Sequence, residues 1–436
     1  MARGACRFFA IVNRQWKGRM TDRQREVATS DDLLAAADDP DVRRIVVAAD
    51  LADVPGFRLS PGQALVGSGQ VVRFATGQDG LRLTADNEVS NLHLVAAPDR
   101  RALFNDTAVE RLGRMLLTDL RVSGVVRLLA RDRVRSGHVE AHGIDIIAAD
   151  ACGFEERPNG FGVEVVAGVF TLWNQQADAG VTITADLTGL SAGRAGAPVR
   201  GSGIFVSGAG GAGGRLIAGR LETGPVFSDG GIAPGTPDRI SGGVFVVHGA
   251  FVDRVRNRGQ VTTYGANDMV LDNWGTVDHW TAEDKITSHG PSGIGFVNFG
   301  AVNRLAVKAT IETFGQGARG FNVYTGTVHH AEFERVLTHG DGAVGIQISQ
   351  PVGQIKVRRG IETYGGTGDS LVKGVVLRLP ATALSIKAGG VARRVEVAGG
   401  LVTHGADIEP LEVRGRIEAL LVEGGFTTAG EGLGTI

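Results

Sequence analysis

Three aspartates lie close together in the second half of the chain. Asp268 and Asp272 precede Trp274, and Asp278 follows four residues later. Hydrolysis of a glycosidic bond uses two carboxyl groups about 5 to 9.5 Å apart, one as acid and one as base or nucleophile. The three aspartates are therefore candidate catalytic residues, with Asp268 and Asp272 as the acid and base. The alternative is that they are ordinary carboxylates on a solvated surface.

Rings recur near these aspartates and suit a sugar ligand, because the apolar C–H patches of a sugar stack on aromatic faces. The candidate substrate-binding residues are four rings and one cation: His248, Trp274, Phe299, Tyr324 and Arg239. A second set of rings precedes a series of glycines: Tyr264, His289, Phe314, His339, Tyr364 and His404. Either set has a purely structural alternative, in which the rings stack on one another or are buried beneath corner loops or a neighbouring subunit.

Elimination is the other way to cleave a glycan. It needs a base and cations that neutralise a uronate carboxylate. Arg239, Arg254, Arg256 and Lys285 are candidates for that role. Salt bridges between neighbouring segments explain the same residues equally well.

A regular repeat must position all of these residues. Short segments that end in glycine recur at Gly265, Gly290, Gly315, Gly340 and Gly365, with a period of 25, and a longer step leads to Gly405. A fixed period in this range is typical of a solenoid, propeller or array. The abundance of glycine, 66 residues, indicates corners where a positive φ is needed.

Each repeat contains three short runs of alternating apolar and polar residues, which predict three strands. Val261, Ile286 and Ile311 occupy equivalent inward positions in the second run. When three strands repeat in this way, equivalent residues of successive repeats lie one above the other. This arrangement predicts an all-β fold, a single-stranded parallel β-helix with coils of about 25 residues. A right-handed winding is expected. A propeller needs about 40 residues a blade, and a leucine-rich repeat needs a leucine spacing that this chain lacks.

The expected organisation has two parts. Residues 1–42 form an N-terminal segment with a short capping helix, because Thr29 to Asp32 are good helix-capping residues and helix formers follow. Residues 43–436 form the β-helix, and glycine-rich loops predict long corner insertions at about 150–240. The short capping helix of the N-terminal segment would cover the open strand edges at the end of the solenoid.

The strand Ile45 to Ala48, the stretch Leu59 to Gly67 and the glycine-cornered coils together resemble the pectin-lyase-like right-handed β-helix superfamily. The resemblance covers most of the chain and implies the fold. Its members include polysaccharide lyases, glycoside hydrolases, epimerases and non-catalytic adhesins or phage spikes. No catalytic motif of a particular family can be carried over residue by residue.

Composition limits the other functions. The formal net charge is −2, with 45 basic and 47 acidic residues, so no nucleic-acid partner is expected. The sequence has no apolar stretch of about 20 residues, the length that would predict a membrane span. Cys6 and Cys152 lie too far apart for a metal-ligand spacing, and His329 and His330 would point to opposite faces of a strand, so no metal and no cofactor are expected. The sequence as written predicts a cytoplasmic protein, or a secreted one if an export signal has been removed.

These observations predict a carbohydrate-active β-helix protein. It would cleave or bind an oligosaccharide or polysaccharide along a lateral groove, formed by an outward sheet and the loops of the 150–240 region. The alternative is a non-catalytic structural or adhesion module, whose ring columns form the interface of a homo-oligomer, for example a homotrimer.

Overall fold

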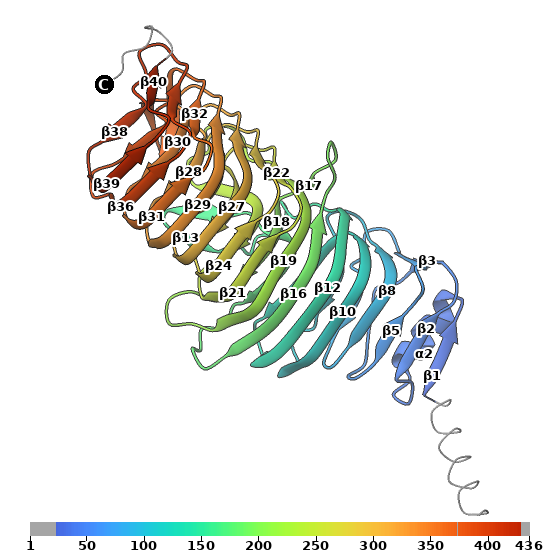
Figure 1. Cartoon of the computed structure of the whole chain (residues 1–436). Coiled ribbons are helices and arrows are strands. Elements are labelled where there is room, and N and C mark those ends of the chain that lie inside the picture. Colours follow the sequence, from blue (N-terminus) through green and yellow to red (C-terminus); the bar gives the residue numbers. More distant parts are fainter. Residues whose placement is uncertain (1–22, 373, 429–436) are drawn as a thin grey trace, which may run out of the picture.

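The computed structural model describes residues 23–372 and 374–428, which wind into a rod of stacked coils (Figure 1). Almost every strand pairs in parallel with the equivalent strand of the next coil. The one helix of the described residues, α2 (Ser30–Asp38), lies near the N-terminus. The predicted all-β parallel β-helix is confirmed.

Three faces make up each coil. The first and second faces belong to one hydrogen-bonded sheet of 23 strands, because several strands run on from one face to the next. The strands of the first face alone are β1 (Gln24–Val27), β2 (Arg44–Val47), β5 (Ala64–Val66), β21 (Ala250–Asn257), β24 (Thr276–Ala282), β31 (Pro351–Val357), β36 (Val391–Val397) and β39 (Arg416–Val422). Those that span both faces are β8 (Glu88–Val95), β10 (Arg111–Ser123), β12 (Ser136–Ala148), β16 (Thr182–Ala192), β19 (Arg215–Asp229), β27 (Ala301–Thr313) and β29 (Thr327–Thr338).

The second face is completed by short strands: β3 (Leu51–Val54), β6 (Val71–Phe74), β17 (Val199–Arg200), β22 (Val261–Thr263), β25 (Ile286–Ser288), β32 (Ile361–Thr363), β37 (Leu401–Thr403) and β40 (Phe426–Thr428). The third face is a separate sheet of β4 (Phe57–Arg58), β7 (Leu81–Leu83), β9 (Arg101–Asn105), β11 (Val125–Ala130), β15 (Gly168–Asn174), β18 (Ser202–Ser207), β20 (Arg239–Val246), β23 (Asp268–Asn273), β26 (Ile294–Asn298), β28 (Arg319–Val323), β30 (Val344–Ile348), β35 (Leu384–Ile386) and β38 (Leu411–Val413). This third face carries the candidate site.

The core runs along the inside of the rod. The predicted inward column of Val261, Ile286 and Ile311 is fully buried, and each residue lies beside the next in the sheet register. Complete burial of a Val or Ile side chain contributes about 1.5–3 kcal/mol. Columns of buried apolar residues such as this one therefore hold the rod together along its length.

Positive φ is found, as expected, at many glycines, including Gly317 and Gly342 just after two corners, but the periodic corner glycines have another cause. None of Gly290, Gly315, Gly340 and Gly365 has a positive φ. A Cβ atom at Gly315 would instead lie 1.9 Å from the carbonyl oxygen of Gly290, and one at Gly340 would lie 2.1 Å from that of Gly315. The repeat therefore requires glycine because successive coils touch backbone to backbone at this corner.

Helix α2 covers the N-terminal end of the rod, as predicted. The Thr29 side chain caps the helix by accepting a hydrogen bond from the Asp32 amide, and Leu33, Ala36 and Ala37 are buried. Strand β1 precedes the helix and already pairs with β2, so the sheet begins upstream of position 43. Among the described helices none is long and apolar enough to cross a membrane.

Two insertions lie over the third face. The first contains β13 (Asn159–Gly160) and β14 (Val163–Val165), and β14 pairs with β20. It falls in the 150–240 region where insertions were expected. The second is an antiparallel hairpin of β33 (Thr367–Val372) and β34 (Val375–Pro380), which occupies the longer step between Gly365 and Gly405. The longer step is visible in the sequence, but the hairpin was not predicted.

Candidate functional site

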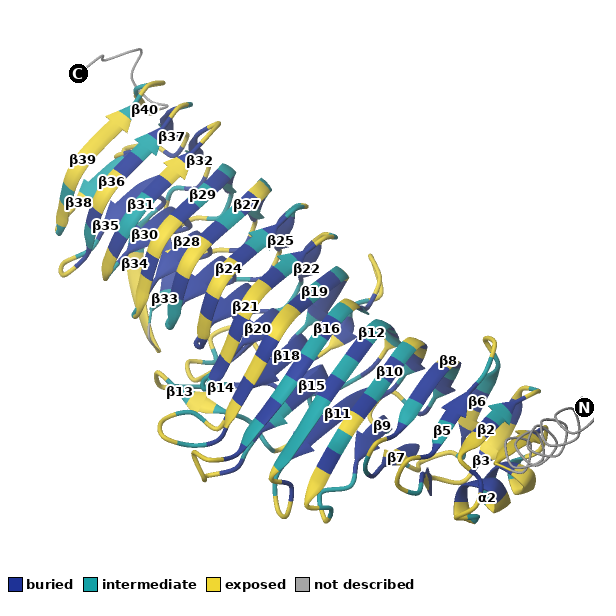
Figure 2. Ribbon diagram, turned by 60° about the horizontal axis from the view of Figure 1, so that its bottom comes forward, coloured by how far each residue is buried: buried dark blue, intermediate teal, exposed yellow. Residues whose placement is uncertain are grey.

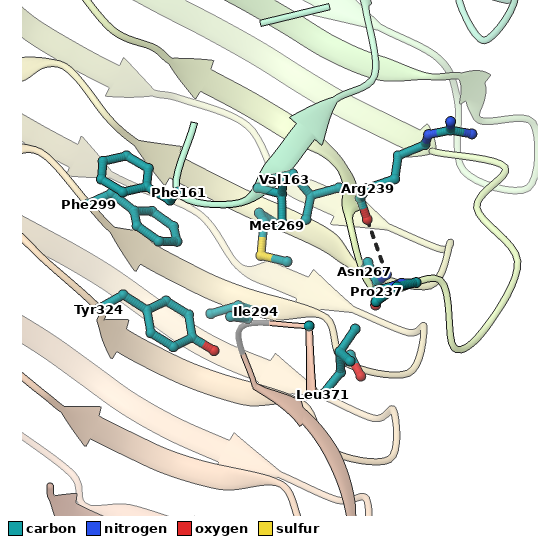
Figure 3. Close-up of a pocket in the computed structure, with 13 residues that line it drawn as sticks. Phe161, Val163, Pro237, Arg239, Asn267, Met269, Ile294, Phe299, Tyr324 and Leu371 are labelled. Atoms are coloured by element: carbon teal, nitrogen blue, oxygen red, sulfur yellow. Dashed lines mark hydrogen bonds between the residues drawn. The ribbon is translucent and has the colours of Figure 1, made fainter. Parts of the chain in front are cut away.

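A small pocket with a free volume of ≈ 60 Å³ lies on the outer side of the third face (Figure 3). Both insertions and strands β20, β23 and β26 contribute to its wall. The lining is mostly apolar: Phe161, Val163, Pro237, Arg239, Ile240, Asn267, Met269, Ser292, Ile294, Phe299, Tyr324, Leu371 and Gly374. A concave apolar site with a few polar groups at its edge is the usual form of a ligand pocket.

Stacked rings form one end of this pocket. The ring centroids of Phe161 and Phe299 lie 4.7 Å apart and those of Phe299 and Tyr324 lie 5.2 Å apart, and both pairs are stacked. Phe161 keeps 44% of its surface exposed and has a φ of 54°, a strained value for a bulky residue. Strain of this kind collects at functional sites, where the surrounding structure enforces it.

The five predicted substrate-binding residues come together around this pocket. Phe299, Tyr324 and Arg239 line it. Trp274 and His248 lie under Phe161, with ring centroids 5.2 and 5.3 Å from it. Trp274 and Tyr324 are only 4% and 7% exposed, so this column is not an open track and matches the alternative in which a loop buries the rings. The rings are buried beneath an insertion of the same chain, which the sequence could not place.

Arg239 is the one Arg or Lys among the described residues that line the pocket, and in Figure 3 its side chain extends away from the rings, with the guanidinium pointing out of the opposite end. Its guanidinium has one distant carboxylate, Glu164, at 3.9 Å. By contrast, Arg256 pairs with Glu283 at 2.6 Å, and Lys285 forms a salt bridge with Glu312. Arg239 is therefore the predicted cation that is best placed to meet an acidic ligand.

Asp268 is buried and lies between Asn267 and Met269, two residues that line the pocket. Its carboxylate accepts hydrogen bonds from the Ser241 hydroxyl at 2.5 Å and from the backbone amides of Gly265 and Gly230 at 2.7 and 3.3 Å. Burial raises the pKa of Asp268 to about 6, against these hydrogen bonds, which lower it. Because its oxygens are occupied by the chain itself, Asp268 has a structural role in this conformation.

Asp272 lies between apolar neighbours on the outer side of β23. Its partners in the sheet register are Phe245 and Val297. The side chain is fully buried and neither carboxylate oxygen makes a hydrogen bond of normal geometry within the described residues. Burial raises the pKa of Asp272 well above its usual value, against the nearby Trp274 indole N–H, which lowers it.

Asp278 lies on another face. It is exposed on β24 of the first face, where it accepts a hydrogen bond from the Asn303 amide at 2.8 Å and contacts His279 at 2.8 Å. The hydrogen bond from Asn303 is the main reason why its pKa is lowered. The three aspartates therefore do not converge, and none of the described residues lining the pocket is an Asp or Glu.

The second ring column stacks on itself. Tyr264, His289, Phe314, His339, Tyr364 and His404 lie one above the next, with centroids 4.3 to 5.1 Å apart and ring planes within 5 to 9° of parallel. Two of the imidazoles also bind carboxylates, His339 with Glu312 at 3.0 Å and His404 with Glu362 at 2.9 Å. Stacking along the rod accounts for this column.

Sequence reasoning missed the residues that complete the pocket from the insertions, above all Phe161 and Leu371. The one signal for Phe161 was its position between Gly160 and Gly162 in a region of expected insertions. Within the described part of the chain, no group of three or more His, Cys, Asp or Glu side chains is arranged to hold a metal ion.

The fold and this site define a parallel β-helix protein with an aromatic, largely apolar pocket on its third face. No protein-family model, curated protein or solved structure matches this chain.

Proposed function

We propose that this protein binds a glycan at the pocket of the third face without cleaving it. A sugar ring stacks against Phe161, Phe299 or Tyr324, and an acidic group of the same glycan meets Arg239. The observation that carries the proposal is the pocket itself, where three rings from separate segments meet and one weakly paired cation lies at the far end. Aromatic stacking plus a few placed polar groups is how concave sites select ligands.

Binding is favoured over cleavage by the position of the carboxyl groups. A glycosidase needs two carboxyl groups that both reach the scissile bond. Asp272 is fully buried between apolar side chains, and Asp268 accepts a hydrogen bond from the Ser241 hydroxyl. Asp278 lies on the first face. The stacked coils and the helix that covers their N-terminal end support a place in the pectin-lyase-like superfamily, among its non-catalytic members.

The alternative class is a structural or adhesion module whose rings form a subunit interface. Phe314 and Tyr364 of the second ring column are 39% and 41% exposed, which leaves their edges open to a partner. Stacking within the chain already accounts for that column, so the pocket supports the binding function better.

Arg239→Gln is expected to weaken binding of an acidic glycan about tenfold or more, because a hydrogen bond to a charged group contributes about 1.5–3 kcal/mol. A glycan array with neutral and carboxylated members, followed by titration of each bound glycan, measures this. Arg254→Gln is the matched control, since Arg254 is also an exposed arginine but lies on β21 of the first face. Equal losses in the two variants, or none in Arg239→Gln, would contradict the assignment.

The unchanged protein is expected to release no new reducing ends and no unsaturated sugars from the glycan that it binds. The reason is that no carboxyl group of the described residues faces the pocket. Turnover that disappears in Asp272→Asn or Asp268→Asn while binding persists would reinstate the enzyme hypothesis. Those two variants, assayed beside the unchanged chain, separate binding from chemistry.

A further inference from the structure

The hairpin of β33 and β34 presents an unusual edge. It is a separate two-stranded sheet, and β34 has no strand partner other than β33 among the described residues. Three successive aliphatic side chains on β34 are exposed, Val375 by 58%, Val376 by 59% and Leu377 by 44% (Figure 2). Folded proteins usually protect such an edge, because it is a template for pairing with another strand.

The inner strand β33 is fastened to the rod. Ser370 is buried, donates a hydrogen bond to the carbonyl oxygen of Gly317 at 3.1 Å and accepts one from the guanidinium of Arg319 at 2.8 Å. Arg319 is itself fully buried. The hairpin is therefore held at β33, and β34 is the strand that it presents outward.

The sequence of β34 is self-complementary. If two copies pair in antiparallel fashion about Leu377, Val375 of one copy faces Leu379 of the other, and Leu377 faces its own equivalent. These residues share one side of the strand, because side chains alternate, so that side is entirely aliphatic. Arg378 meets Val376 rather than the second Arg378, and within its own hairpin it lies opposite Asp369. Centring the pair on Arg378 instead would set two like charges against each other, which is destabilising.

We propose that β34 is the contact between two copies of this chain, which join their hairpins into one four-stranded antiparallel sheet. A two-stranded sheet is only marginally stable by itself, and two further strands that share an apolar side would stabilise it. The interface lies next to the mouth of the pocket, since Leu371 and Gly374 of the same hairpin line it. This inference does not depend on the proposed glycan function.

Cysteine cross-linking of the full chain tests the pairing and its register, in a background where Cys6 and Cys152 are replaced by serine. Leu377→Cys is expected to form a disulfide-linked dimer on mild oxidation, because the two residues 377 face each other at the short separation that a disulfide needs. Val375→Cys is the matched control on the same side of the same strand. In this register the two residues 375 lie four positions apart along the strands, about 13 Å, so they are expected to stay unlinked.

Light scattering during size-exclusion chromatography gives the second measurement. The unchanged chain is expected to elute at twice its mass of 45.5 kDa, and Leu377→Lys at the single mass, because two lysines would oppose each other. Val413→Lys, at a residue of similar exposure, 47%, on the last coil, is expected to keep the dimer. A monomeric unchanged chain, dissociation by Val413→Lys alone, or equal cross-linking at 375 and 377 would overturn the proposal. A β-type circular dichroism spectrum and a cooperative thermal transition show that Leu377→Lys has folded as a monomer.

Discussion

Replacing Asp272 with valine is expected to raise the free energy of unfolding at pH 7 by about 2 kcal/mol, the usual cost of a buried polar group without a hydrogen-bond partner. Valine continues the register column between Phe245 and Val297. Both neighbours are apolar and buried, so the substituted side chain meets matching surroundings. Equilibrium unfolding in urea, with the unchanged chain in parallel, measures the difference.

The same substitution changes how stability depends on pH. Burial raises the pKa of Asp272 and Asp268 above their usual value of 3.8, so both carboxyl groups favour the neutral form in the folded chain. Such a group contributes its full stability below the unfolded pKa and loses it as pH rises through the folded pKa. The unchanged protein is therefore expected to lose stability from about pH 4 through pH 6, where Asp268 titrates, and Asp272→Val should lose less.

Asp268→Val is the contrasting variant. Its carboxylate accepts three hydrogen bonds, so removal leaves the Ser241 hydroxyl and two buried backbone amides without their acceptor. This variant is expected to be less stable than the unchanged chain, by about 1–3 kcal/mol or more. A destabilised Asp272→Val, with the fold otherwise intact, would show that the Asp272 carboxyl has a partner or function that the apolar layer conceals.

Gly315→Ala is expected to destabilise the rod by about 3 kcal/mol, because the added Cβ cannot be accommodated without moving backbone. It would lie 1.9 Å from the carbonyl oxygen and 2.4 Å from the carbonyl carbon of Gly290. The same contact recurs between the corners of successive coils, so a shift at Gly315 disturbs the coils on both sides. Thermal and urea unfolding of the full chain give the size of the loss.

Gly219→Ala is the matched control for this prediction. Gly219 lies in a strand, has no positive φ, and a Cβ there would meet no atom within 4 Å. Alanine at such a position is expected to leave stability unchanged or to raise it by about 0.4–1 kcal/mol, since the unfolded chain loses freedom. If both variants have the same stability, the close approach of the coils is not what requires glycine at the corner.

Much of the fold could be predicted from the sequence because neighbouring coils repeat the same contacts. Once Val261, Ile286 and Ile311 were placed in one column, their burial and parallel pairing followed. The stacking of Tyr264 on His289 followed in the same way. The expected positive φ occurs at many glycines but does not explain the periodic ones, because the contact between Gly290 and Gly315 depends on how closely two coils approach, and a sequence does not state that distance.

The sequence by itself determined the solenoid and its inward columns, because these rest on contacts that recur at a fixed spacing along the chain. It determined the N-terminal helix because capping residues and helix formers act locally. The five candidate binding residues lie in one region, and their role in binding stays a prediction. Only the tertiary structure decided what covers that region. Phe161 reaches Phe299 from a segment well over a hundred residues away, and no period links the two positions. That contact makes the row of rings part of a pocket, and the burial of Asp272 keeps its carboxyl out of the pocket lining, which is the basis of the proposal that the protein binds a glycan.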